Sequence, residues 1–327
     1  MRFSRPTLAA ILAVSVSSLS MTACGSDTGQ GGATDVKFGY ISDYNGASLL
    51  AIAENQGLWE DADLNVDVKS FTNGPVQIQA LGAGDLDFGY IGPGAMWLPA
   101  SGKCKVVAIN TLAYADRVIA QPGISSIEGL KGKKVGVPEG TSGEMALNLA
   151  LEDAGMSPGD VQKVPMEPST VVSAFASGQI DGAGIWYPLI DTIKEKVPEL
   201  NEVASTRDMG DKSFPTAFVG GNGVDEETTT KVIGVLQKAN DWRAEHPDET
   251  IAQTAEMLEI SEKDVERDAA NVETMPTADL VKATEDGTTD QWLNGLSEFF
   301  VDTGQLQSVP APEDYYTGDL YTKAYQK

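Results

Sequence analysis

The chain has 327 residues, 41% of them hydrophobic, and a formal net charge of −25. So large an excess of carboxylates would repel a phosphate backbone, which excludes nucleic acid as an expected partner. With one histidine and two cysteines, the sequence offers almost nothing for a zinc site or a Ser-His-Asp triad, and we expect no metal.

The N-terminus has the pattern of an export signal. Two arginines precede an apolar run from Leu8 to Leu19 that is too short to span a bilayer, so residues 1–23 are expected to be a signal peptide. Met21-Thr22-Ala23-Cys24 resembles the lipobox of bacterial lipoproteins, with Met21 in place of the usual leucine. The resemblance implies lipidation of Cys24; cleavage without lipidation is the alternative. Residues 24–34 would then tether an extracytoplasmic protein to the cell membrane.

Strands and helices alternate in the chain that follows. Strands are expected at 35–41, 64–68, 86–91 and 106–112, with helices at 47–56 and 76–81.

The alternation continues from Gly129 to Leu189. Strands are expected at 133–138, 161–166 and 180–186, with one helix ending at Gly155 and another running from Pro168 to Gly178. This order predicts a parallel sheet with right-handed crossovers, and ligands of such sheets bind beyond the carboxyl ends of the strands. Those ends carry Thr141-Ser142-Gly143 and Trp186-Tyr187.

Thr141 and Glu144 have the spacing of a capping box at the start of a helix. In such a box the Thr141 hydroxyl takes the Glu144 N–H, and the Glu144 carboxylate returns to the Thr141 N–H. The N–H groups of Ser142 and Gly143 would stay free to bind an anion at the positive end of the helix. The alternative is that the box only starts a helix.

An internal repeat predicts two similar α/β lobes. Residues 80–91 align with residues 174–185: each segment is a helix end, a glycine, and a strand that carries aspartate near its start. We expect an α/β fold with one lobe at 35–120 plus 218–327 and the other at 121–217. A chance match of two ordinary α/β connections is the alternative.

Beyond Gly221 the pattern becomes helical. Helices without intervening strands are expected at 225–245, 250–258, 262–271 and 288–303, and their apolar stripes predict a C-terminal helical extension packed on the first lobe. The chain would then cross between the lobes twice, near 117–122 and near 214–220. Two crossings form a hinge, and a small ligand would bind in the cleft between the lobes.

Two reactive residue types are assigned no function. His246 stands before Pro247 at an expected helix end, where a solvated side chain is the simplest interpretation. Cys104 is expected to be an inert thiol at a strand start, because lipidation of Cys24 would leave it without a partner for a disulfide.

The export signal, the two lobes and three segments, LKGKKVGVPEGTSG, AFASGQIDGAGIW and ALGAGDLDFGYIGP, resemble the solute-binding proteins of ABC importers. The similarity is to the branch for aliphatic sulfonates, taurine and nitrate, which also contains pyrimidine-precursor binders. It covers residues 35 to about 303 and implies the periplasmic-binding-protein type II fold. It also implies that an anionic ligand end is held by Thr141, Ser142 and Gly143. The residues expected to face this end across the cleft are Asp43, Tyr44, Asn45, Gly92 and Pro93.

The sequence departs from this branch beside Trp186. Many sulfonate binders have Trp-Asp-Pro where this chain has Trp186-Tyr187-Pro188, and the missing carboxylate is an obvious counter-charge for an amine such as that of taurine. Asp43 or Asp116 could replace it, while Tyr187 could hydrogen-bond a ligand or stack on a flat one. Taurine is therefore less favoured than an amine-free sulfonate.

The expected function is capture of a small anionic solute by a monomer that needs no cofactor and delivers the solute to a membrane permease. Two other classes remain open. A sensory lipoprotein would pass its closed state to a membrane kinase. A thiamine-pyrimidine-synthase-like enzyme would share the fold but use an active-site histidine, and His246 lies outside the loops of the lobes, so no enzymatic activity is expected.

Overall fold

The computed structural model describes residues 32–210 and 212–325. The signal peptide, Cys24 and most of the tether lie outside these residues, so their assignments stay predictions. Within the described part, no helix has the length and apolarity that a membrane span requires.

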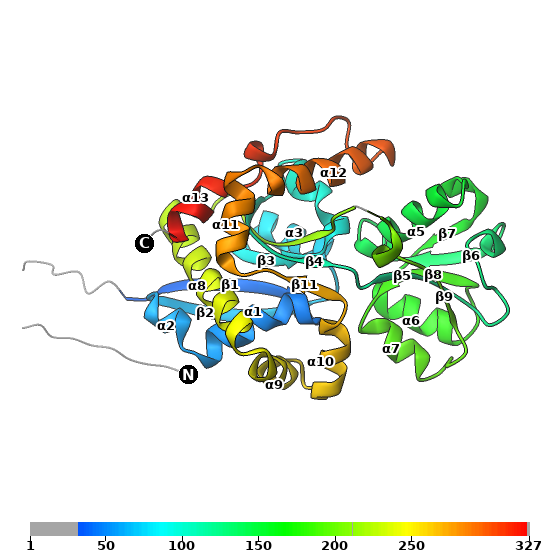
Figure 1. The fold of residues 1–327 in the computed structure, drawn as a ribbon, viewed down its shortest axis with the longest axis horizontal. Helices are drawn as coiled ribbons and strands as arrows, with labels where there is room; N and C mark the ends of the chain where they lie inside the picture. The colour runs from blue at the N-terminus through cyan, green and yellow to red at the C-terminus, as the bar shows by residue number, and fades with distance from the viewer. Residues whose placement is uncertain (1–31, 211, 326–327) are drawn as a thin grey trace, which may run out of the picture. The chain divides into compact units, whose positions relative to one another are not determined.

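Two mixed β-sheets organise the chain, one in each lobe (Figure 1). The first sheet has the strand order β11-β4-β10-β3-β1-β2, and the second has the order β7-β6-β8-β5-β9. The expected two-lobed α/β fold is confirmed. The strands of the first sheet are β1 (Thr34–Ile41), β2 (Leu64–Phe71), β3 (Phe88–Ile91), β4 (Lys105–Ala113), β10 (Pro215–Gly220) and β11 (Val272–Thr274). Those of the second are β5 (Asp116–Ala120), β6 (Lys134–Val137), β7 (Gln162–Pro165), β8 (Gly182–Trp186) and β9 (Asn201–Ser205).

The parallel pairing expected between Gly129 and Leu189 is confirmed for β6, β7 and β8, although each sheet as a whole is mixed. β1 and β6 pair in parallel with their neighbours, but β10 is antiparallel to β3 and β4, and β5 is antiparallel to β8 and β9. β5 and β10 are the segments in which the chain enters a lobe from the other lobe. They arrive without a crossover helix, so nothing forces them to run parallel. The range 121–217 expected for the second lobe therefore omits β5 and includes the start of β10.

Helices cover both sheets. The second lobe contains α5 (Ser142–Asp153), α6 (Pro168–Ala176) and α7 (Leu189–Lys194), and the first lobe contains α1 (Tyr44–Asn55), α2 (Leu58–Asp61), α3 (Gly74–Ala83) and α4 (Trp97–Ala100). Short 3₁₀ turns lie at η1 (Pro93–Ala95), η2 (Glu128–Leu130), η3 (Pro158–Asp160), η4 (Thr206–Asp208) and η5 (Pro312–Asp314).

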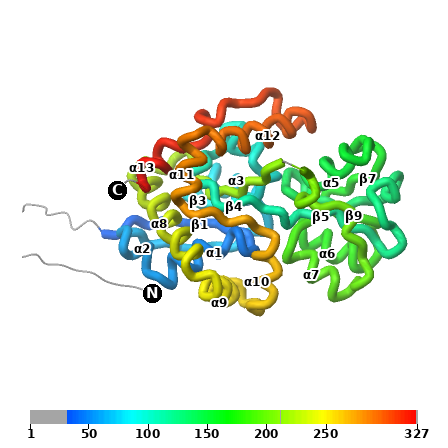
Figure 2. The backbone as a smooth tube through the Cα atoms, viewed as in Figure 1, coloured from blue at the N-terminus to red at the C-terminus, as the bar shows by residue number. Residues whose placement is uncertain are grey.

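The C-terminal helices pack on the first lobe, as expected. They are α8 (Glu226–Glu245), α9 (Pro247–Leu258), α10 (Glu262–Ala269), α11 (Thr277–Glu285), α12 (Thr288–Asp302) and α13 (Gly318–Tyr325). In Figure 2 the orange helices α11 and α12 run beside the cyan strands of the first lobe, and α12 contacts α4. The expected absence of strands here is wrong, because β11 adds an edge strand beside β4.

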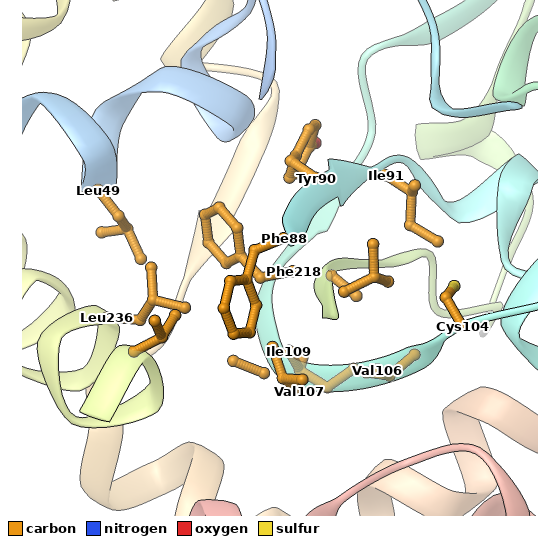
Figure 3. Packing of buried hydrophobic residues seen from close by; sticks show 14 of the residues in the cluster. Leu49, Phe88, Tyr90, Ile91, Cys104, Val106, Val107, Ile109, Phe218 and Leu236 are labelled. Carbon is orange, nitrogen blue, oxygen red and sulfur yellow. The ribbon is translucent and has the colours of Figure 1, made fainter. Parts of the chain in front are cut away.

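The core of the first lobe is an aromatic stack between the sheet and its helices. The Phe38 ring lies 5.6 Å from that of Phe88 and 5.7 Å from that of Phe218, measured between centroids. In Figure 3 Leu236 of α8 and Leu49 of α1 lie beside this stack. Because these residues come from distant parts of the sequence, this packing attaches α8 to the first lobe.

The internal repeat has one structural role in both lobes. The carboxylate of Asp87 accepts the Lys37 N–H of β1 at 2.8 Å, and that of Asp181 accepts the Lys134 N–H of β6 at 3.0 Å. Each aspartate therefore joins the end of a helix connection to the neighbouring parallel strand. The match is thus structural, and the two lobes repeat one unit.

Candidate ligand-binding site

A pocket lies between the lobes, at the carboxyl ends of the parallel strands. β1 leads into Asp43, β3 into Gly92, β6 into Thr141 and β8 into Tyr187. Residues of both lobes therefore line it.

The structure brings nine of the eleven expected ligand-binding residues to this pocket. They are Asp43, Asn45, Gly92, Pro93, Asp116, Thr141, Ser142, Trp186 and Tyr187. Tyr44 and Gly143 do not line it. Tyr44 donates its N–H to Asp268 Oδ2 at 2.6 Å and packs beneath α9 and α10.

Gly143 faces the sheet of its own lobe rather than the pocket. A Cβ atom built on Gly143 would lie 2.4 Å from the Gly184 carbonyl oxygen of β8. The glycine therefore lets α5 approach β8. Its N–H, expected to stay free for an anion, donates to the Thr141 hydroxyl instead.

The expected capping box also differs in its hydrogen bonds. The Thr141 hydroxyl accepts the Gly143 N–H at 3.3 Å and donates to the Pro138 carbonyl at 2.6 Å. The Glu144 carboxylate accepts the Gly140 N–H at 2.7 Å and pairs with Lys163. The two oxygens of the Glu144 carboxylate are occupied by Lys163 and by the Gly140 N–H, so the reciprocal bond to the Thr141 N–H does not form. Ser142, with its hydroxyl and first helical N–H, is what α5 presents to the pocket.

Both lobes contribute to the rim, where hydrogen bonds join them. Gly94 N–H donates to Ser142 Oγ at 3.2 Å, and Trp97 Nε1 donates to the Gly140 carbonyl at 3.3 Å. On the other side, Arg267 Nε lies 3.1 Å from Asp191 Oδ2. Hydrogen bonds and an ion pair therefore join the lobes around the pocket.

The pocket is acidic. None of the described residues that line it is Lys, Arg or His, but two of them, Asp43 and Asp116, are acidic. The pKa of Asp116 is raised to about 7, chiefly by burial; the charge of Arg117 opposes this rise and the charge of Asp268 adds to it. Burial also raises the pKa of Asp43. An anionic group would therefore have to rely on neutral donors.

Tyr187 contributes its ring but not its hydroxyl. The hydroxyl lies 2.5 Å from Glu202 Oε1 and 2.5 Å from Lys194 Nζ, and the Arg117 guanidinium lies 5.4 Å from the ring centroid. The hydrogen bond from Tyr187 to a ligand, considered from the sequence, is thus replaced by this ion-pair cluster.

Several lining residues were not predicted from the sequence. They are Ile41, Asn73, Gly74, Tyr90, Ala95, Ala113, Ala115 and Thr216. Asn73 follows β2 and could have been found by the rule that located Gly92 after β3. Thr216 lies on the antiparallel strand β10, and no sequence signal placed that strand in the first sheet.

His246 and Cys104 stay outside the site. The His246 ring stacks on Trp242 with centroids 4.6 Å apart, where α8 ends and α9 begins. Cys104 is buried before β4, and burial raises the pKa of its thiol to about 12, so it is a poor nucleophile. Among the described residues, no group of His, Cys, Asp and Glu has the arrangement of a metal site.

Comparison with known proteins identifies the chain's relatives. A sequence model for the family described as NMT1/THI5 like matches residues 47–250. A Brucella abortus protein, named only as a binding protein, is 53% identical over 291 residues, covering 88% of this chain and 91% of the relative. A Bacillus subtilis protein named for binding aliphatic sulfonates is 29% identical, covering 81% and 84%. The alkanesulfonate-binding protein SsuA of Xanthomonas axonopodis has a similar structure, with a TM-score of 0.69, 20% identity, and coverage of 87% and 98%.

Proposed function

Since the chain belongs to the NMT1/THI5-like family, we propose that it is the extracytoplasmic solute-binding lipoprotein of an ABC importer. The observation that carries the proposal is a pocket lined by both lobes and bordered by hydrogen bonds between them. A solute in this position stabilises the state in which the lobes touch, and a permease can recognise that state. No reaction of the solute is required.

The proposed solute is a small organic molecule with an acidic group, such as a sulfonate. Its acidic group would lie at Ser142, whose hydroxyl and N–H stand at the positive end of α5. The name of the Bacillus subtilis relative supports this class. The lack of a cationic side chain among the described lining residues favours an organic solute over nitrate, because a bare inorganic anion would gain little from neutral donors.

A pyrimidine-type heterocycle is the second candidate. Trp186 and Tyr187 line the pocket with aromatic rings, and the two aspartates could accept the N–H groups of such a ring. Import rather than sensing is part of the proposal. Neighbouring genes for an ATPase and a permease would support it, and a neighbouring membrane kinase would contradict it.

A thermal-shift screen tests the proposal. The chain from Gly25 onward is unfolded and refolded to remove any bound solute, then heated with alkanesulfonates, taurine, nitrate, carboxylates and pyrimidines. A ligand at about a hundred times its dissociation constant adds about 2.7 kcal/mol to the free energy of unfolding, a shift of several degrees. If no compound of these classes shifts the midpoint, the proposed solute class is wrong.

Two serine variants locate the acidic group. Ser142→Ala should weaken binding of a sulfonate that shifts the midpoint by about tenfold, because a hydrogen bond to a charged group is lost. Ser177→Ala, which removes a hydroxyl at the exposed end of α6, should leave the affinity unchanged. Equal affinity in both variants would remove Ser142 from the site.

A further inference from the structure

Two carboxylates of the pocket come from opposite lobes. Asp43 precedes α1 in the first lobe, and Asp116 is the first residue of β5 in the second. Their exposed fractions are 7% and 2%. Burying a carboxylate costs free energy unless a cation or several hydrogen-bond donors face it. The donors and cations around these two carboxylates therefore show which group a solute would have to supply.

Asp116 has no partner from another residue. Among the described residues, only its own backbone N–H is close enough to bond its carboxylate. The neighbouring Arg117 is held elsewhere, because its Nε lies 2.9 Å from Glu202 and its Nη2 donates to Asn271 Oδ1 at 2.8 Å. The Asp116 carboxylate is therefore a buried acceptor that lines the pocket without a donor from another described residue.

Asp43 is only partly satisfied. Its Oδ1 accepts the Gly46 N–H at 2.7 Å as the N-cap of α1, and no described side chain donates to Oδ2. The amide nitrogen of Asn45, a residue 4% exposed, likewise lines the pocket without a described partner, since its oxygen takes the Thr111 hydroxyl. Three polar side chains with unused hydrogen-bonding capacity, those of Asp43, Asn45 and Asp116, thus line the pocket.

The charges behind the pair do not neutralise it. Asp268 on α10 adds a third buried carboxylate, whose pKa is raised by burial and by the charge of Asp43. The pKa of Asp43 is itself raised by burial and by the charge of Asp116. Arg243 on α8 donates to Asn240 Oδ1 at 2.6 Å and lies 3.3 Å from Ser48 Oγ. Tyr90 on β3 is neutral, because burial raises its pKa well above the ordinary value. No cation of the described residues faces the pocket.

We propose that Asp43 and Asp116 together bind a nitrogen cation of the solute, such as an ammonium or protonated amino-heterocycle group, and that the lobes close on this group. The inference rests on the proposed function and adds the second end of the solute to it. It corrects the lower rank given to amine-bearing ligands from the sequence Trp186-Tyr187-Pro188, because the counter-charge comes from other elements.

The two carboxylates also affect closure of the protein without solute. Closure brings two carboxylates from different lobes into one buried space, so their repulsion opposes closure when both are ionised. Protonation removes this repulsion, and a bound cation does so as well. Without solute, the lobes should therefore separate as the pH rises through the raised pKa of Asp116, about 7, and approach again as it falls.

Small-angle scattering of the solute-free chain tests this directly. We expect the radius of gyration to increase between about pH 5.5 and about pH 8.5 in the wild type, but not in the Asp43→Asn, Asp116→Asn double variant. Asparagine keeps the N-cap at position 43, so α1 should be retained. The control is Glu144→Gln, a buried carboxylate beside the pocket whose charge Lys163 already pairs. It should behave as the wild type. A wild type that does not change, or a double variant that changes equally, overturns the proposal.

Calorimetry with matched compounds tests the cation. Taurine is compared with 2-hydroxyethanesulfonate, and 4-aminopyrimidine with pyrimidin-4-one, each pair differing in the nitrogen group. The amine should bind better. The affinity for taurine, whose ammonium stays protonated in this range, should rise between about pH 6 and about pH 8 as protons leave the aspartates. Asp116→Asn should weaken binding of the amine roughly 10- to 100-fold and leave binding of its matched compound unchanged.

The outcomes separate the two proposals. Binding of only the partners that lack the amino group would keep the solute class of the pair that binds and overturn the cation site. If no compound binds, the proposed solute class fails, and scattering still decides whether the aspartate pair controls closure.

Discussion

Asp116 makes closure of the pocket costly in the absence of a solute. Its pKa in the folded chain is about 7, against 3.8 ordinarily, so the folded state holds a proton that the unfolded state releases between those values. Stability from this group is therefore present below about pH 4 and lost as the pH rises to about 7.

Asp116→Asn should consequently stabilise the protein at neutral and alkaline pH. The upper limit is roughly 4 kcal/mol, from about three pKa units at 1.36 kcal/mol each. Thermal unfolding at about pH 8 should show a higher midpoint than in the wild type, and at about pH 4 the two should agree. A variant less stable than the wild type at both pH values would mean that the carboxylate has a partner in the folded state.

Two variants of Tyr187 distinguish the role of its ring in lining the pocket from a role of its hydroxyl in binding the solute. Its hydroxyl belongs to the cluster with Glu202 and Lys194, so Tyr187→Phe should cost about 1 kcal/mol of stability and leave solute affinity within about twofold. Tyr187→Ala removes the ring from the pocket and should weaken binding at least tenfold. Urea unfolding and calorimetry measure the two effects. Loss of affinity in the phenylalanine variant would show that the hydroxyl reaches the solute.

At the scale of elements, the seat of α5 on β8 sets the position of Ser142. Gly143 and Gly184 approach each other so closely that a Cβ on either would lie 2.4 Å or 2.1 Å from the other's carbonyl oxygen. Gly143→Ala should therefore push the helix away and cost about 1–3 kcal/mol in urea unfolding, with weaker solute binding.

The matched control for this variant is Gly234→Ala. Gly234 lies inside α8 with nothing within 4 Å of its would-be Cβ, so alanine should stabilise that helix by about 0.5–1 kcal/mol. If Gly143→Ala were equally stabilising, the close approach of α5 to β8 would be wrong.

Local signals in the sequence predicted the βα units well, and with them the residues after β1, β3, β6 and β8. Each of these units has a short apolar run followed by turn residues and a periodic helix. β5 and β10 were interpreted as hinge segments, because a strand that pairs with residues far along the chain has no local signature beyond its apolar character. Thr216 was missed with β10, and the capping of Thr141 was misassigned because Lys163 acts from another strand.

At the scale of the whole molecule, one glycine permits the lobes to meet. A Cβ on Gly94 of the first lobe would lie 2.3 Å from the Ser142 nitrogen and 2.4 Å from the Thr141 carbonyl carbon, both backbone atoms of the second lobe. No rotamer change relieves such a contact. Any side chain at position 94 must therefore hold the lobes apart, and this also uncovers Met145 and Leu149 of α5, which belong to the same apolar cluster as the core of the first lobe.

Gly94→Val should consequently separate closure from folding. Scattering at about pH 5.5 should give a larger radius of gyration than the wild type, and affinity for a solute found by the thermal-shift screen should fall at least tenfold, because only one lobe can reach it. Stability in urea should fall by about 1–3 kcal/mol, because opening uncovers the apolar contact of Met145 and Leu149 with the first lobe. In Gly223→Val, where valine enters open space in the same lobe, it should change by less than about 1 kcal/mol. Wild-type affinity in Gly94→Val would mean that the solute does not need both lobes, and the coupling of Asp43 to Asp116 would then have no mechanical basis.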